Sequence, residues 1–458
     1  MKISRRTMLA SAASLPALSF LDAAANAQPA YTPDDLKSTL TPLGGLRAGN
    51  AEGTIPAWTG EVPALPAGWE SGMRRPDPFA GDAAVATINA ANMAQYQDKL
   101  PAGVIQLLKL HSDCEIQVFP THRTGVAPQY VYDYVYKNAT SAQLSPDGNN
   151  LSGAYGGIPF PIPTNGKQVI WNHLLRWFGA TIKAAGGTWQ ITSSGEVILR
   201  AFTKAKYQVP YYFEGREADF NGIYEQFLVQ DIAPAYAEGQ EALVLTSLNP
   251  LEEPNKAYEY LLGERRVRLA PQLNYDTPVD LAGGIVNWDE GAMFNGALND
   301  YDCTIVGKKE IYVPYNCNKA WNTPATDVMG PKFVNNGVIR YELHRVWVVE
   351  MTLAPGMRNV DARRTVYVDE DTWLALAIDI YDSSGSLWKH QYAVAAICSD
   401  IPAMCSGFYF IMHDFHSGSY VNFGGVDLVR NPDSWYVTPE LPSSFFTPGE
   451  LSALAGGN

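Results

Sequence analysis

The stretch "RTVYVDEDTWLALAIDIYD" (residues 364–382) decides how this chain folds. Residues that favour strands, β-branched and aromatic, lie on both sides of three consecutive acids: Asp369, Glu370 and Asp371. Asp favours turns because its side chain bonds to nearby backbone. We therefore predict two antiparallel strands joined by a hairpin turn whose acids are solvated. A metal or acid–base site is the alternative, but it would need further oxygen ligands, and no loop pattern supplies them.

The same pattern extends over residues 338–395 and predicts a four-stranded antiparallel meander. The strands are expected within residues 338–353, 362–368, 372–381 and 386–394. The turns between them are too short for crossover helices. Neither face of these strands is strongly polar, so each face needs cover. Helices or loops supply such cover, or else the sheet curves around a cavity.

Other segments have periodicities that predict helices. Residues 86–100 predict a helix that ends before Pro101, and residues 168–184 predict a second helix with one apolar face. Residues 255–263 predict a short helix closed by Gly263.

Further strands are predicted outside the meander. Residues 188–192 and 196–203 predict two strands joined by a turn, and residues 265–271 and 307–316 also have strand character. "QYVYDYVYK" (residues 129–137) alternates strictly, which predicts a strand with one aromatic face. That face would carry Tyr130, Tyr132, Tyr134 and Tyr136.

The N-terminus predicts export from the cytoplasm. "SRRTML" (residues 4–9) is a twin-arginine pattern, and the apolar stretch that follows is too short to span a bilayer. Small residues at Ala25 and Ala27 fit cleavage after Ala27. An ordinary Sec signal is the alternative, and either route leads to the periplasm. We expect a signal peptide at residues 1–27 and a single domain at residues 28–458, which begins with an extended arm at residues 28–85.

The charge and the composition narrow the possible functions. The formal net charge is −14. Removing residues 1–27 removes three positive charges and one negative charge, which leaves −16. An acidic protein is a poor match for nucleic acid or for an anionic membrane surface. Charged residues make up only 17% of the chain, which has 25 tyrosines, and this favours a β-rich fold with amphipathic surfaces.

Five cysteines are expected to meet an oxidising compartment. Their spacing suggests two disulfides, Cys303–Cys317 and Cys398–Cys405, with Cys114 left as a free thiol. No CxxC motif and no histidine at ligand spacing accompanies them, so we do not expect a metal bound by cysteine.

Three motifs carry residues of chemical interest. In "HDFH" (residues 413–416), a metal site would need the imidazoles of His413 and His416 on the same side of the chain. A helix or a turn allows this and a strand does not, and no third ligand is evident nearby. His344 and Glu350 share a strand face but are too far apart to pair, which favours structural roles.

The third motif, "GERRVRLAP" (residues 263–271), contains Arg265, Arg266 and Arg268. Arg266 and Arg268 would share a strand face on which they could clamp a carboxylate or phosphate, but ion pairs within the protein are the preferred interpretation.

The signatures of common enzymes are missing from the sequence. There is no nucleophile elbow, no P-loop, no HExxH and no dinucleotide-binding fingerprint. Triads are defined by geometry rather than by sequence order, so this does not exclude a hydrolase. We expect no catalytic residues, no metal and no cofactor.

Stretches along most of the chain resemble the bacterial domain-of-unknown-function family 1329, whose members are labelled outer-membrane lipoprotein-sorting proteins. They include "TPLGGLRAGNAEGTIPAWTG" (41–60), "YGGIPFPIP" (155–163), "WNH" (171–173), "GERRVRLAP" (263–271), "YDTP" (275–278), "FNG" (294–296), "VGKKEIYVPYN" (306–316), "RYELHRVWVVE" (340–350), "VYVDEDTW" (366–373) and "YDSSGSLWK" (381–389). The resemblance implies an α+β, mainly β fold like that of the periplasmic lipoprotein carriers. Its large, strongly curved antiparallel sheet would form an open half-barrel, with helices and loops plugging the concave side.

The resemblance and the aromatic rows together suggest a periplasmic carrier of a lipid or another hydrophobic molecule, and they suggest an association with the outer membrane. The resemblance also implies an efflux-type inner-membrane transporter and an outer-membrane protein as partners. The helix at residues 168–184 and the loop at residues 155–163 would gate the site. The candidate ligand-binding residues are Tyr130, Tyr132, Tyr134, Tyr136, Phe160, Trp177, Arg266, Arg268, Trp347 and Trp373.

Two other functions remain open. One is a hydrolase-like enzyme that acts on a hydrophobic substrate through His413, Asp414 or His344. The other is an adaptor of an envelope transport complex that binds no ligand. A cavity of several hundred Å³ would support the carrier, because ligand pockets have that size, and a solid interior would count against it.

Overall fold

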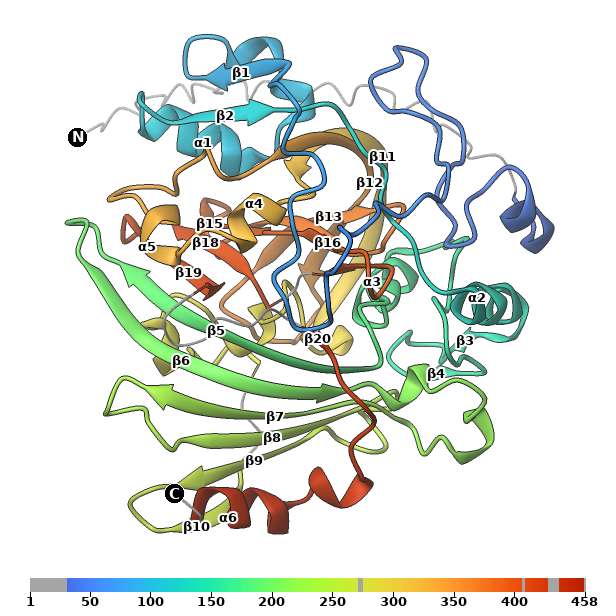
Figure 1. The fold of residues 1–458 in the computed structure, drawn as a ribbon, viewed down its shortest axis with the longest axis vertical. Coiled ribbons are helices and arrows are strands. Elements are labelled where there is room, and N and C mark those ends of the chain that lie inside the picture. Colours follow the sequence, from blue (N-terminus) through green and yellow to red (C-terminus); the bar gives the residue numbers. More distant parts are fainter. Residues whose placement is uncertain (1–30, 271–274, 406–407, 427–435, 457–458) are drawn as a thin grey trace, which may run out of the picture.

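One open β-sheet organises the molecule. The computed structural model describes residues 31–270, 275–405, 408–426 and 436–456. Sixteen of the described strands form this sheet, in the order β1-β2-β12-β13-β14-β15-β18-β19-β5-β6-β7-β8-β9-β10, with β11 paired to β12 and β20 paired to β5. Figure 1 shows β5 to β9 as long curved strands that extend away from the central strands.

The strand bounds follow the chain order. They are β1 (Ala86–Asn89), β2 (Glu115–Val118), β3 (Gln143–Leu144), β4 (Leu151–Ser152), β5 (Thr181–Ile191), β6 (Val197–Gln208), β7 (Ile223–Ala233), β8 (Glu241–Ser247), β9 (Lys256–Leu261), β10 (Arg266–Leu269), β11 (Tyr301–Pro314), β12 (Tyr341–Leu353), β13 (Arg363–Asp369), β14 (Ala375–Tyr381), β15 (Leu387–Ala393), β16 (Ala396–Cys398), β17 (Ala403–Cys405), β18 (Phe410–Asp414), β19 (Ser419–Gly425) and β20 (Tyr436–Val437).

The helices are short and few compared with the strands. They are α1 (Ala102–Leu110), α2 (Gln129–Ser141), α3 (Gly166–Leu174), α4 (Asn318–Trp321), α5 (Ala325–Val328) and α6 (Pro448–Gly456), with one-turn 3-10 helices such as η1 (Pro33–Lys37), η7 (Trp288–Glu290) and η9 (Ser443–Phe445). Within the described ranges, every helix is too short or too polar to cross a membrane.

The predicted fold class is confirmed. The sheet is antiparallel apart from one parallel bridge between Tyr341 and Val118, and it ends at β1 and β10 without closing. The predicted meander is β12 to β15, and the predicted strand pair is β5 and β6. The prediction succeeded here because alternating apolar residues and short turns specify antiparallel pairing locally.

The prediction for residues 129–137 is wrong, because this segment belongs to helix α2. Val131, Val135 and Asn138 are its buried residues, at the spacing of one helix face. The alternating tyrosines obscured the helical spacing of these buried residues. Pro128 precedes the helix, and the Asn138 side chain donates to the carbonyl oxygens of Tyr155 and Gly157.

The helix predicted at residues 168–184 is only partly correct. Helix α3 begins at Gly166 and ends at Leu174, and residues from Thr181 onward belong to strand β5. The Asn165 side chain caps α3 by accepting from the Gln168 backbone N–H.

Two further helix predictions are wrong. Residues 86–100 form strand β1 and two 3-10 turns, and α1 starts only after Pro101, which favours a helix start over a helix end. Residues 256–261 form strand β9 rather than a helix, because Tyr258 and Tyr260 pack against the neighbouring part of the sheet.

The expected Cys303–Cys317 disulfide is also wrong. Strand β11 is extended between these residues and separates them by about 35 Å, whereas bonded cysteines need Cα atoms within about 7 Å. Cys398 and Cys405 are free thiols as well, contrary to the expected bond. In the β16–β17 hairpin, Cys398 lies opposite Ala403 and Cys405 lies opposite Ala396, so the two cysteines are diagonal neighbours. Their thiols are hydrogen-bonded to each other.

Residues 31–85 contain η1 and no strand longer than a single bridge, and they run over the body of the protein (Figure 1). From here on, the term arm refers only to residues 40–58, a part of the N-terminal segment predicted to be extended. Helix α1 covers the centre of the sheet, where Asp379 of β14 accepts hydrogen bonds from the N–H groups of Ala102 and Gly103. The expected signal peptide, residues 1–27, lies outside the described residues.

Gly103 provides a test of this packing. A Cβ atom at Gly103 would lie 2.1 Å from Cγ of the buried His390. We expect Gly103→Ala to lower the free energy of unfolding by about 3 kcal/mol, since overpacking of a filled core costs about that much. Urea unfolding checks this value. Gly81→Ala is the control, because nothing lies within 4 Å of its Cβ position. Equal stability of the two variants would contradict the packing described.

Candidate functional site

The three acids of the opening stretch lie in the β13–β14 turn, as predicted, but they are not solvated. Asp369, Glu370 and Asp371 are 0%, 1% and 2% exposed. Trp373 completes the turn with a positive φ of 61°, and its indole N–H donates to the carbonyl of Leu43 in the arm. Buried carboxylates persist only when they are paired or protonated, so the partners of these acids define the site.

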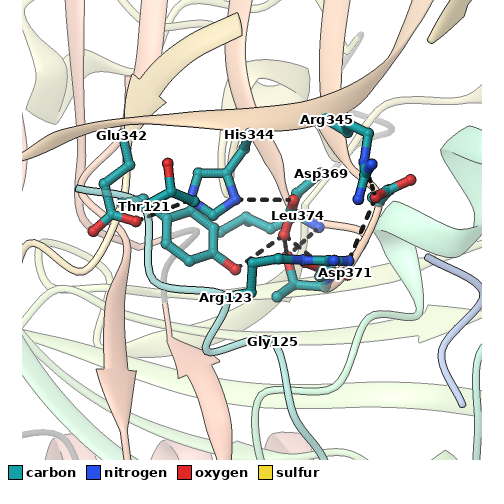
Figure 2. Close-up of polar contacts among 12 residues, drawn as sticks. Thr121, Arg123, Gly125, Glu342, His344, Arg345, Asp369, Asp371 and Leu374 are labelled. Atoms are coloured by element: carbon teal, nitrogen blue, oxygen red, sulfur yellow. Dashed lines mark hydrogen bonds and ion pairs between the residues drawn. The ribbon is translucent and has the colours of Figure 1, made fainter. Parts of the chain in front are cut away.

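Arg123 is the main partner of this turn. Its guanidinium forms a bidentate pair with Asp371 at 2.8 and 2.6 Å. The same guanidinium donates to arm carbonyls, including those of Leu46 at 2.8 Å and Pro56 at 3.3 Å. Arg123 thus joins the hairpin turn to the arm. Figure 2 shows this guanidinium beside Asp371.

Glu370 is neutralised by two other cations. Lys308 of β11 lies 2.9 Å from one carboxylate oxygen, and Arg345 of β12 lies 2.7 Å from the other. These cations lower the pKa of Glu370 against the effect of burial. Arg345 also donates to the arm carbonyls of Leu46 and Ala48. The turn is therefore fixed to two strands and to the arm.

Asp369 is the least satisfied acid of the turn. Its Oδ2 accepts from the Tyr315 hydroxyl at 3.1 Å and from the Thr372 hydroxyl at 2.7 Å. Its buried Oδ1 has no hydrogen-bond partner and lies 3.9 Å from Nδ1 of His344. Burial and the Asp371 charge raise the pKa of Asp369 to about 6.

His344, Asp369 and Asp371 offer three possible metal-ligand atoms within 4.8 Å of one another. Both oxygens of Asp371 already accept from Arg123, and the fixed positive charge beside them opposes a cation. His344 is engaged through Nε2, 3.1 Å from Glu342. The arrangement is that of a buried ion-pair network that holds the arm on the sheet.

The other motif of interest does not assemble a site. His413 is buried on β18, whereas His416 lies in the following turn and stacks on Trp388. Asp414 accepts from the backbone N–H of His416 and from the indole N–H of Trp388. The two imidazoles therefore lie apart, as strand geometry implies. Glu350 pairs with Arg363 and not with His344.

The four α2 tyrosines do not share one face. Tyr130 packs edge-on against Trp177, and Tyr134 packs against Tyr155. Tyr132 accepts from the backbone N–H of Ala127, and Tyr136 donates to Asp34. These tyrosines are bound to other parts of the chain.

Two of the remaining candidate residues lie together. Trp347 and Trp373 stack beside the buried turn, with ring centres 6.1 Å apart, and Phe160 is buried in the main core. Arg266 and Arg268 lie on β10 and pair with Glu264 and Glu259 respectively, as the preferred interpretation predicted.

The two pockets identified among the described residues are small. Two pockets lined by described residues have volumes of about 10 and 30 Å³, which is room for about one water molecule each. One lies under α1, between Leu107 and Tyr392, and the other lies between Trp171 and Tyr275. Neither approaches the several hundred Å³ that a ligand pocket needs.

A second apolar surface lies outside the main core. On one face of β7 to β10, apolar side chains form a separate cluster that we call the strip: Leu228, Leu243, Leu245, Tyr258, Tyr260 and Val267. Strand register places them on one face, since Leu228 lies opposite Leu243 and Leu243 lies opposite Tyr258. The strip is a continuous apolar surface about four strands wide.

The C-terminal segment, residues 436–456, covers the strip. It pairs with β5 through β20, and its Leu441 backbone bonds to the Gln208 side chain of β6. Phe446 and Leu451 are buried on the strip, with Phe445 and Leu454 half-buried beside them. Figure 1 shows this segment crossing the long strands to reach α6 beside β10.

Sequence reasoning missed most of these residues. Arg123 stands alone in a Pro-rich and Gly-rich stretch, and nothing local links it to Asp371, which is 248 residues away. The strip was missed because β9 was predicted as a helix. Tyr258 and Tyr260 alternate with Ala257 and Glu259, and this alternation was a signal that could have revealed the strand.

We expect Arg123→Ala to destabilise the protein by about 3–5 kcal/mol, because the variant leaves the Asp371 carboxylate buried without its partner. Proteolysis within residues 40–58 should accelerate, because the arm loses its donors. Lys137→Ala is the control, since its pair with Glu217 is half exposed and contributes less than about 1 kcal/mol. Unchanged proteolysis of the arm in Arg123→Ala would disprove the assigned role.

Asp369 also predicts a dependence of stability on pH. A carboxyl group whose pKa is about 6 in the folded state and 3.8 in the unfolded state binds its proton more tightly when folded. The contribution of Asp369 to the unfolding free energy should therefore decrease as the pH rises from about 4 to about 6. Asp369→Asn should remove this part of the slope in urea titrations at several pH values. A variant with the wild-type slope would show that Asp369 titrates normally.

Comparison with known proteins assigns the family. The model of the family described as "Protein of unknown function (DUF1329)" matches residues 87–452. The Pseudomonas aeruginosa protein PA3922 is 38% identical over 362 residues, which cover 77% of this chain and 78% of that protein.

Solved structures resemble the chain more remotely. A domain from Vibrio parahaemolyticus, named for outer-membrane lipoprotein sorting, is 13% identical with a TM-score of 0.42 and covers 62% of this chain and 97% of its own. A DUF1329 family protein from Desulfovibrio piger is 14% identical with a TM-score of 0.40 and covers 60% and 92%. TM-scores this low do not establish a shared fold. The family model and the identity to PA3922 do establish the family: the chain belongs to DUF1329.

Proposed function

We propose that this protein is a periplasmic carrier of hydrophobic molecules and that its ligand binds on the strip, in the place that α6 occupies in this structure. The observation that carries the proposal is the separate apolar cluster on β7 to β10, which among the described residues only the C-terminal segment joins from outside the sheet. Export to the periplasm rests on the twin-arginine pattern at residues 4–9.

The small volume of the two pockets limits where a ligand can bind. An acyl chain does not fit into spaces of 10 or 30 Å³. Binding therefore requires that part of the protein moves from an apolar surface. The part that moves must be held by few polar contacts, since buried ion pairs are costly to separate.

The arm and helix α6 both cover parts of the sheet, and they differ in this respect. The arm is held by the buried Arg123 and the partly buried Arg345, which both pair with turn acids and bond to arm carbonyls. Helix α6 is held on the strip by apolar contacts of Leu451 and Leu454, and Phe446, just before the helix, is buried in the same cluster. Helix α6 is thus the segment that a hydrophobic ligand can displace most easily.

The energies of the two states are comparable. Burial of Phe446 and Leu451 contributes about 1.5–3 kcal/mol each, so the closed position gains roughly 3–6 kcal/mol from them. A ligand that buries ten methylenes gains about 8 kcal/mol. Displacing the closed position leaves roughly 2–5 kcal/mol of this gain, and the loss of translational freedom reduces it further. Micromolar affinity needs about 8 kcal/mol, so a ligand with more than ten methylenes is required.

Helix α6 and the strip replace the gate and the lining residues that we expected from the sequence. The loop at residues 155–163 and helix α3 are largely buried in the main core. An efflux-type inner-membrane transporter and an outer-membrane protein remain the partners that we propose for loading and unloading. Pockets this small also fit an adaptor that binds no ligand, and the experiment below separates the two.

We expect Leu451→Asp in the full chain to increase the affinity for the neutral probe N-phenylnaphthylamine by about tenfold or more. The aspartate disfavours the closed position, and a larger open population raises the apparent affinity in proportion. Fluorescence titration gives the dissociation constants. Ala453→Asp is the matched control, because Ala453 lies on the exposed side of the same helix.

Copurification supplies an independent measurement. Native mass spectrometry of the protein from its own host should show a bound hydrophobic molecule. If neither Leu451→Asp nor the wild type binds the probe, and nothing copurifies, the carrier function is refuted and the adaptor is favoured.

A further inference from the structure

We infer that the ligand of the strip is a single-chain amphipathic anion, whose carboxylate or phosphate lies beside Lys206 and whose alkyl chain lies across β7 to β10. This inference rests on the proposed function and adds the class of ligand. Among the described residues, it follows from one row of side chains that crosses six strands.

The row follows from the strand register. Residues directly opposite each other in antiparallel strands share a face of the sheet. From β5 to β10 the row reads Lys183, Lys206, Leu228, Leu243, Tyr258 and Leu269. Two lysines stand at one end and four apolar or aromatic residues follow. The row therefore has the polarity of an amphipathic anion: a charged end and a long apolar end.

Lys204 strengthens the basic end of this row. It lies two residues from Lys206 on β6, on the same face, and it is exposed. The protein as a whole carries a net charge of −14, so a group of three lysines on adjacent strands is a local reversal of its charge. Such a group attracts a carboxylate or a phosphate.

An acid lies beside the apolar part of the row, on the middle strand of the strip. Glu241 of β8 lies on the same face, is buried and accepts from Gln230 through one carboxylate oxygen only. Its partner strand carries Tyr260 directly opposite. A second negative charge would be repelled there. The anionic end of a ligand is thus directed to the lysine side of the row.

The length of the row limits the length of the chain. Four strand spacings separate β6 from β10, which is about 19 Å at about 4.8 Å per strand. An extended alkyl chain advances about 1.25 Å per methylene, given a carbon–carbon bond of about 1.5 Å, so about 15 methylenes span this distance. The row matches a chain of roughly 14 to 18 carbons.

The C-terminal segment follows the same path with the same polarity. Its Phe445 ring lies under the Lys206 ammonium, 4.3 Å away. Burial and the Lys183 charge lower the pKa of Lys206, and the Glu450 carboxylate of α6 partly offsets this lowering. Leu451, next to Glu450, is buried on the apolar residues of the row. The protein therefore places its own carboxylate near Lys206 and its own apolar side chains on the strip, as the ligand would.

A paired binding series tests this inference on the full chain. We expect hexadecanoate to bind Leu451→Asp at least about tenfold more tightly than the neutral hexadecanol, since one well-placed ion pair is worth about 1.4 kcal/mol, which is tenfold. Among saturated fatty acids from 8 to 20 carbons, affinity should rise with length and level off near 16 carbons.

The Lys206→Glu substitution, added to Leu451→Asp, should abolish the preference for hexadecanoate while binding of hexadecanol persists. Lys109→Glu is the matched control, because it makes the same charge change on the exposed end of α1. A preserved alcohol affinity shows that the variant is folded.

Three outcomes distinguish the claims. A preference for the acid that Lys206→Glu removes supports the inference. Equal binding of the acid and the alcohol overturns the inference and leaves the proposed carrier intact. Absence of binding for both compounds, with a folded protein by circular dichroism, overturns both.

Discussion

The guanidinium of Arg123 is the contact on which the arrangement of this protein depends. It closes a bidentate pair with Asp371 inside the protein and uses its remaining donors on the backbone of the arm. An unpaired carboxylate at that depth would cost several kcal/mol, so the turn, the arm and Arg123 must fold together. The neighbouring pairs of Glu370 with Lys308 and Arg345 extend the same joint into β11 and β12.

This ion-pair network has a consequence for function. The charge pairs of the β13–β14 turn hold the arm on the sheet, and the two pockets are too small for an acyl chain. Under the proposed function, a hydrophobic molecule therefore exchanges with a segment held mainly by apolar contacts. Helix α6 is such a segment, and it lies on a surface of Leu and Tyr side chains that continues into lysines on β5 and β6. Charge pairs fix the arm in place, whereas hydrophobic contacts of limited strength leave α6 exchangeable.

The sequence alone predicted the local architecture well and the site poorly. The β12 to β15 meander followed from alternation and short turns, both of which are local properties. Helix α2 was mistaken for a strand because four alternating tyrosines masked the spacing of Val131, Val135 and Asn138. β9 was mistaken for a helix because its short apolar run fits either periodicity.

The burial of Asp369, Glu370 and Asp371 could not be predicted in the same way. The turn was correct, but its cover comes from the arm and its counter-charges from Arg123 and Lys308, all distant in sequence. The small size of the two pockets likewise depends on how loops and helices pack after folding. A resemblance to carriers suggests a cavity, whereas the binding surface that we propose is the apolar cluster under α6.

The central claim is that a bound chain takes the position of the C-terminal segment. Hydrogen–deuterium exchange of the full-length wild-type protein, with and without saturating hexadecanoate, measures this directly. The account predicts faster exchange in residues 448–456 when the ligand is present, with no change in the arm at residues 40–58. Unchanged or slower exchange in residues 448–456, at a ligand concentration shown to saturate binding, would contradict it.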